Sequence, residues 1–281
     1  MALPFVASDA GLLILQAGVV ISPRAVKTPG WVGRFRGRGW GLVPIASIVL
    51  VVFAIRFVSD TATGLTYLAL VAIPPLAAAA LAWAIRGARV WLGPLAVVLF
   101  ALAWLWRGSL VGEAAAALLS GLSCVTLGVL LGMVTPSGWL KAGIVLMSAA
   151  DVWLVTSDLL QAPNATLVAA APAGGLPQLQ SETFGSANMG YGDVFVAGLL
   201  GAVLSGSVRR QRRAGVLTLL LAALFNLLFL VINELPATVP VAFALLLEAA
   251  WARWRPEWPR WPSAWRRCRS KPAAATPRPA K

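Results

Sequence analysis

The stretch 188-NMGYGDVFVAGLLGAVL-204 combines a long apolar run with spaced glycines and one acidic residue, Asp193. Its apolar part is typical of a helix that lies in lipid, where small residues let neighbouring helices approach closely. A carboxylate near the centre of such a helix costs about 2.5–3.5 kcal/mol on insertion scales. The stretch alone therefore predicts a membrane helix with a costly Asp among small residues, and the reason for this acid has to come from the rest of the chain.

The rest of the chain has the composition of an integral membrane protein. Of its 281 residues, 59% are hydrophobic and only 12% are charged, and long apolar runs recur along almost the whole length. The formal net charge of +13 does not predict nucleic-acid binding, because the basic residues lie in loops and in one tail. We therefore expect an all-α polytopic membrane protein and no nucleic-acid partner.

Nine apolar segments are long enough to be transmembrane helices, for which about 17–25 residues are needed. Their ranges are 3–22, 41–58, 62–85, 90–106, 109–134, 138–160, 186–208, 214–234 and 236–252. We expect a single nine-helix transmembrane domain over residues 1–252, followed by a separate tail, 253–281. The domain divides into an N-terminal part (1–134), a central part with the acids (138–208) and a C-terminal pair (214–252).

Charges in the loops predict the orientation of these segments. Basic residues crowd the loop after the first segment and the sequence RRQRR at 209–213, whereas the long loop 161–185 contains Glu182 and no Lys or Arg. The positive-inside rule then places the N-terminus outside and the C-terminus in the cytoplasm. The Ala-, Arg- and Pro-rich composition suggests the plasma membrane of a bacterium.

The tail mixes Trp and Arg and is broken repeatedly by Pro. This pattern favours an interfacial anchor on anionic lipid, although stacking aromatics beside Arg would also suit RNA or another protein. Cys124 lies in an apolar segment and Cys268 in the tail, so no disulfide framework is predicted. The oligomeric state is not predicted by the sequence.

No residue in the chain is a His. This excludes the usual zinc sites and the imidazole-dependent serine and cysteine triads. We expect neither a metal nor a cofactor.

Two further acids accompany Asp193 in apolar surroundings. Asp151 lies about nine residues from the outer end of 138–160, and Asp193 about seven residues from the outer end of 186–208. At about 1.5 Å per residue those depths differ by only about 3 Å, so neighbouring antiparallel helices would bring both carboxyl groups to one level. Asp158 falls near the segment's end, where we expect a solvated helix terminus, as we do for Glu113.

Two carboxyl groups at one depth in a low dielectric would share a proton. Such a pair can hydrolyse a peptide bond: the ionised member activates water, and the neutral member protonates the carbonyl oxygen. The same acids could instead be held for packing specificity in a catalytically idle scaffold, or bind ions in a proton-coupled transporter. A transporter would be expected to show pseudo-symmetric broken helices, and the sequence contains no such pair.

Three motifs resemble those of the GxGD intramembrane aspartyl proteases, the presenilin and signal peptide peptidase family. ADVWLV around Asp151 resembles the YD motif, GYGDV matches GxGD at Asp193, and ELPATVP at 234–240 stands where the family carries PAL. The likeness covers roughly residues 138–247. It implies a nine-helix fold and an aspartic endopeptidase that cleaves within transmembrane segments, with Asp151 and Asp193 as its catalytic acids. The residues implied to shape the site or meet substrate are Gly190, Tyr191, Gly192, Pro236 and Ala237.

The chain departs from these motifs at two positions. Ala150 replaces the Tyr of YD, which puts the tuning of the first acid in doubt, and Thr238 replaces the Leu of PAL. Pro236 and Pro240 lack amide donors, so we expect them to loosen the helix start and free backbone groups for an unwound substrate.

The predicted orientation refines the expected substrate. It is that of signal peptide peptidase, which implies signal-peptide remnants or type II membrane segments as substrates. The stretch MGYGDVFVAGLLGAV is also similar to prepilin peptidases, another GxGD membrane protease group. Those enzymes usually carry a Lys soon after the second acid, whereas Val194 and Phe195 follow Asp193 here, so that alternative ranks second.

Overall fold

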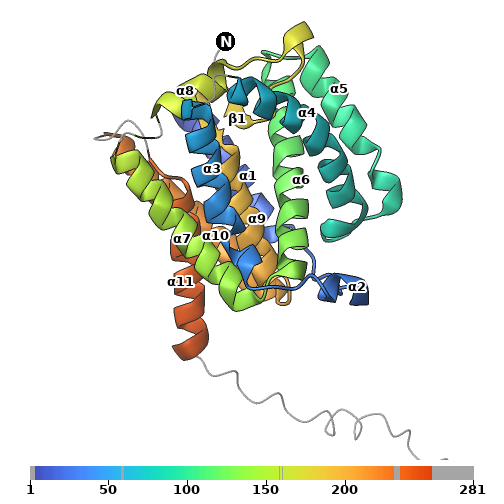
Figure 1. The fold of residues 1–281 in the computed structure, drawn as a ribbon, viewed down its shortest axis with the longest axis vertical. Coiled ribbons are helices and arrows are strands. Elements are labelled where there is room, and N and C mark those ends of the chain that lie inside the picture. Colours follow the sequence, from blue (N-terminus) through green and yellow to red (C-terminus); the bar gives the residue numbers. More distant parts are fainter. Residues whose placement is uncertain (1–3, 58–59, 158, 160, 231–234, 255–281) are drawn as a thin grey trace, which may run out of the picture. The chain divides into compact units, whose positions relative to one another are not determined.

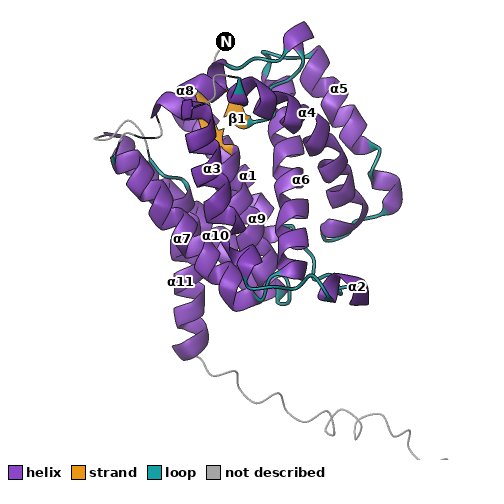
Figure 2. Ribbon diagram, in the orientation of Figure 1, coloured by secondary structure: helices purple, strands orange, loops and turns teal. Residues whose placement is uncertain are grey.

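A computed structural model of the chain describes residues 4–57, 60–157, 159, 161–230 and 235–254 (Figure 1). The fold is mainly helical, with one small sheet (Figure 2). The α-helices are α1 (Phe5–Ile21), α2 (Gly30–Gly33), α3 (Val43–Phe57), α4 (Thr61–Ala79), α5 (Leu95–Leu105), α6 (Leu110–Val134), α7 (Ser137–Thr156), α8 (Gln161–Ala169), α9 (Tyr191–Leu204), α10 (Val208–Phe225) and α11 (Thr238–Trp254). Shorter helical turns are η1 (Gly39–Leu42), η2 (Ala80–Ala84), η3 (Val90–Leu92), η4 (Ala173–Gly175) and η5 (Asn226–Leu230).

Each segment predicted to be a transmembrane helix contains a helix in the structure. Among the described residues, five helices are long and apolar enough to cross a membrane: Gly39–Phe57, Thr61–Ala84, Leu110–Val134, Ser137–Thr156 and Val208–Leu228. Three more are apolar but shorter: Phe5–Ile21, Val90–Leu105 and Tyr191–Leu204. Large apolar side chains such as Leu50, Val71 and Leu220 point outward, with 70%, 75% and 61% of their surface exposed. Such a surface suits lipid rather than water.

Helices α6 and α9 form the centre of the residue 1–248 unit. Helix α6 packs against α9, α4, α5 and α1, while α1 packs against α10 and α9. A Cβ atom at Gly128 would collide with the carbonyl of Gly198, and a Cβ at Gly198 would collide with the carbonyl of Cys124. The two backbones therefore touch directly, which is the way small residues bring helices together in membranes.

The largest departure from the sequence prediction lies just before α9. Residues 186–190 were predicted to begin a helix, but Ser181–Phe184 (β1) and Ala187–Gly190 (β2) form an antiparallel hairpin, in which Ser181 pairs with Gly190. Gly185 at the turn has φ of 61°, a conformation that glycine adopts without strain. An isolated two-stranded hairpin is marginal, so its contacts with α1 and α6 are needed to hold it.

Glu113 takes part in holding the hairpin. Its Oε2 accepts a hydrogen bond of 2.7 Å from the Gly185 N–H, and the side chain is half-buried. Glu113 lies in the first turn of α6, at a helix end as predicted, and it holds the hairpin in addition. Asp158, for which the same was predicted, lies outside the described residues.

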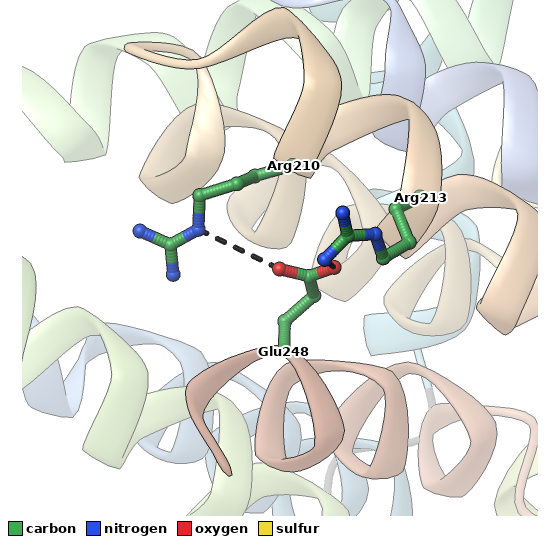
Figure 3. Close-up of polar contacts among 3 residues, drawn as sticks. All are labelled: Arg210, Arg213 and Glu248. Atoms are coloured by element: carbon green, nitrogen blue, oxygen red, sulfur yellow. Dashed lines mark ion pairs between the residues drawn. The ribbon is translucent and has the colours of Figure 1, made fainter. Parts of the chain in front are cut away.

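The predicted arginine-rich loop at 209–213 is also different in the structure. These residues form the first turns of α10, which begins at Val208, because Arg is a good helix former and the helix can extend beyond the apolar segment. Arg210 and Arg213 reach the buried carboxylate of Glu248 on α11, with N–O distances of 3.5 and 3.4 Å (Figure 3). The pair of arginines ties α11 to α10.

The compact unit that contains α6 and α9 ends at Glu248, and Ala249–Lys281 forms a second unit. Within the second unit, the structure describes the end of α11. The predicted tail lies outside the described residues from 255 onward.

We expect Glu248→Gln to lower the free energy of unfolding by about 1–2 kcal/mol, measured by thermal unfolding in detergent. The loss should be smaller than that for breaking a fully buried pair, because the arginine side chains are partly in solvent. Arg212 lies on the same helix and is exposed, so Arg212→Gln is the matched control and should change stability by less than about 0.5 kcal/mol. An unchanged unfolding midpoint for Glu248→Gln would show that the ion pairs contribute nothing measurable.

Candidate active site

Asp151 lies on α7, five positions before the helix ends at Thr156. Its residue surface is only 4% exposed. The Thr238 hydroxyl donates a hydrogen bond of 2.6 Å to Asp151 Oδ2. The first acid is therefore held by the first residue of α11.

Asp193 is the third residue of α9, closer to the helix end than the sequence predicted, because the hairpin takes up residues 187–190. The N–H of Gly190 donates to Asp193 Oδ2 at 3.1 Å. A carboxylate at this position caps the free amides of a helix N-terminus and interacts favourably with the helix dipole. Asp193 thus has a local structural role whatever else it does.

The two acids lie on helices that pack together. A Cβ atom at Gly192 would be 3.4 Å from the methyl group of Met147, which is one helical turn before Asp151 on α7. The carboxyl groups of Asp151 and Asp193 are close enough for their charges to repel each other. Met147 on α7 therefore packs close to Gly192 at the start of α9.

One cavity of about 1420 Å³ contains both acids in its wall. This exceeds the range of about 300–1,000 Å³ that is usual for small-molecule pockets. Apolar side chains from α3, α4, α6 and α7 form much of the remaining wall. Every residue that the sequence assigned to the site lies on this cavity: Asp151, Asp193, Gly190, Tyr191, Gly192, Pro236 and Ala237.

Tyr191 is turned partly toward α6. Its hydroxyl forms a hydrogen bond of 2.7 Å with the hydroxyl of Ser123, and its carbonyl accepts a long contact of 3.9 Å from the Cys124 thiol. These contacts fix the residue between the two glycines of the GYGD sequence. The tyrosine therefore anchors the helix start to α6.

The backbone around Pro236 differs from the prediction that it would be free for a substrate. The Pro236 carbonyl accepts from the Val239 N–H at 3.2 Å, and the Ala237 carbonyl accepts from Gln16 Nε2 at 3.1 Å. Pro240 is the third residue of α11, where a missing N–H costs nothing because first-turn amides have no intrahelical partner. The prolines fit a normal helix start, and the Pro236 and Ala237 carbonyls are already used.

Three residues at or near the site were not assigned to it by the sequence. Thr238 counted only as a departure from PAL, but its hydroxyl holds Asp151. Gln16 is completely buried on α1. The sequence feature that could have pointed to it is a single amide side chain within an apolar segment. Glu182, predicted to lie in a loop outside, is 1% exposed on β1.

Neither carboxyl oxygen of Glu182 has a hydrogen-bond partner among the described residues. Burial raises the pKa of the Glu182 carboxyl well above its usual range, and the charge of Asp193 raises it further. No cluster of three His, Cys, Asp or Glu residues suited to a metal ion occurs in the described part of the chain. A buried carboxyl group with a raised pKa therefore lies near Asp193.

No protein-family model, curated protein or solved structure matches this chain. The interpretation of the site therefore rests on its own residues and their geometry.

We expect Glu182→Gln to stabilise the folded protein at pH 7 by about 1–3 kcal/mol, because the buried acid has to take up a proton on folding at that pH whereas the amide is already neutral. The wild-type chain must take up a proton on folding, since an unfolded Glu has a pKa of about 4.3. The advantage of the variant should therefore disappear as the pH falls below about 4. Thermal unfolding at both pH values is the measurement, and a gain of equal size at pH 7 and pH 4 would contradict the explanation.

Proposed function

We propose that this chain is an intramembrane aspartyl protease of the GxGD type, with Asp151 and Asp193 as its catalytic acids. The observation that carries the proposal is that two carboxyl groups from neighbouring helices face the same large, mostly apolar cavity. Their charges interact, so one proton shared between them is more favourable than two ionised groups. That is the state from which a pair of carboxyl groups activates water.

The hydrogen bonds at the site leave both acids able to react. Thr238 occupies Oδ2 of Asp151, and Gly190 occupies Oδ2 of Asp193. Asp151 also accepts a hydrogen bond from the Thr238 backbone, but a carboxyl group has about four lone-pair sites, so both acids can still meet water or a substrate carbonyl. The ionised acid takes a proton from water while the water oxygen bonds to the carbonyl carbon, and the neutral acid protonates the carbonyl oxygen. Collapse of the tetrahedral intermediate breaks the C–N bond, and the amine leaves with a proton from the pair.

The substrate that fits this site is a transmembrane segment. The cavity wall is largely apolar, so a lipid-soluble peptide can enter it without losing solvation. A helix hides its own carbonyl groups, so the segment must unwind locally before water can attack. The proposal includes the nine-span topology with an external N-terminus and a cytoplasmic C-terminus. In this orientation the expected substrates are signal-peptide remnants or type II membrane segments.

Cleavage of a tagged model transmembrane substrate, co-expressed with the protein, tests the proposal. We expect Asp151→Asn and Asp193→Asn each to reduce cleavage at least ~10²-fold at equal membrane levels, because each removes one of the two proton-transferring groups. Asp60→Asn is the matched control: Asp60 is exposed at the start of α4, and Asn is an equally good helix cap.

Two results would overturn the assignment. Cleavage that survives Asp193→Asn would mean that this carboxylate serves only as the cap of α9. An inactive wild type, with the substrate shown to be in the same membrane, would contradict the proteolytic function itself.

A further inference from the structure

Gln16 forms hydrogen bonds with two parts of the site: the start of α9, which carries Asp193, and the residue before α11, which precedes Thr238. Its Nε2 donates to the carbonyl of Asp193 at 3.4 Å and to the carbonyl of Ala237 at 3.1 Å. The side chain comes from α1, it is completely buried, and its Oε1 has no partner among the described residues. A buried amide in an apolar helix is costly unless its hydrogen bonds matter, and both bonds that Gln16 makes lead to the site.

The connection continues through Thr238 to the other acid. Ala237 is followed directly by Thr238, whose hydroxyl donates to Asp151 Oδ2 at 2.6 Å. An unbroken path therefore runs from Asp193 through Gln16, Ala237 and Thr238 to Asp151. The path crosses α9, α1, the start of α11 and α7, and it involves no group that a substrate has to replace.

We propose that Gln16 and Thr238 are positioning residues that together set the separation of the two acids. This inference rests on the proposed function. In the membrane interior no hydrophobic force presses helices together, so interhelical hydrogen bonds and close packing must fix their relative placement. A misplacement of about 1 Å between reacting groups can cost ~10²-fold in rate. Among the described residues, no direct hydrogen bond joins Asp151 on α7 to α9, so the path through Gln16 and Thr238 is the polar connection between the two acids.

The proposal makes Thr238 a functional substitution. With Leu in its place, Asp151 would lose the hydroxyl donor and keep only the hydrogen bond from the backbone of residue 238. The chain therefore has a different means of holding its first acid from the one that the PAL sequence would supply at this position.

The test compares isosteric variants that remove only the hydrogen bonds. Gln16→Leu and Thr238→Val should each lower kcat about ten- to hundredfold. KM should stay within about twofold, because neither side chain is proposed to bind substrate. Thr238→Ser keeps the hydroxyl and should recover most of the activity that Thr238→Val loses.

Gln211 supplies the matched control for Gln16. It too is a completely buried glutamine that donates to two carbonyls, those of Pro23 at 2.9 Å and Gly201 at 3.1 Å, but at the far end of α9 from Asp193. Gln211→Leu should lower thermal stability and leave the kcat of the folded fraction unchanged. If Gln16 only stabilised the fold, Gln16→Leu would behave in the same way.

The outcomes separate this inference from the proposed function. If wild type cleaves and the Asp→Asn variants do not, but Gln16→Leu or Thr238→Val retains wild-type kcat, the positioning role is overturned while the protease stands. Equal losses in Thr238→Val and Thr238→Ser would also overturn it, because the hydroxyl would then be irrelevant. An inactive wild type rejects the protease first, and the positioning role with it.

Discussion

The backbones of α6 and α9 meet at Gly128 and Gly198 with no side chain between them. In lipid, close contact of this kind replaces the hydrophobic force that holds soluble helices together. It fixes the axis of α9, and the bond between Tyr191 and Ser123 on α6 fixes where the helix starts. Asp193, two residues later, therefore has a defined position before any contact with α7 is made. The position of α9, and with it that of Asp193, depends on this packing.

Much of the site could be predicted because its residues are unusual for their surroundings. An acid in an apolar segment has a high cost and so attracts attention, which is how Asp151 and Asp193 were found. Glycines on either side of Tyr191 indicate a close approach, and Met147 does pack against Gly192. That both acids line one cavity follows from helices α7 and α9 being antiparallel neighbours. These features depend on composition and on short sequence separations.

The remaining features depend on contacts between residues far apart in the chain. The hairpin at 181–190 is stabilised by α1, α6 and Glu113, and its sequence, SETFGSANMG, was divided by the prediction between a loop and the start of a helix. Thr238 and Gln16 are ordinary residues whose partners, Asp151 and Ala237, are distant in sequence. Nothing in the local pattern distinguishes a threonine that holds an acid from one that faces lipid. Hydrogen-bond partners of this kind become visible only in three dimensions.

The hydrogen-bonded carbonyls at the start of α11 have a consequence for inhibitors of such a site. Pro236 and Ala237 already accept hydrogen bonds from Val239 and Gln16, so a donor on a peptide mimic would have to share each of these oxygens with an existing hydrogen bond. The carboxyl groups of Asp151 and Asp193 can each accept further hydrogen bonds. Under the proposed function, a compound with a hydroxyl in place of the substrate carbonyl, carried on an apolar scaffold, would match both the carboxyl pair and the apolar wall of the cavity. The selectivity of such an inhibitor would then depend on how its shape fits the cavity wall formed by α3 and α4, more than on hydrogen bonds to the protein backbone.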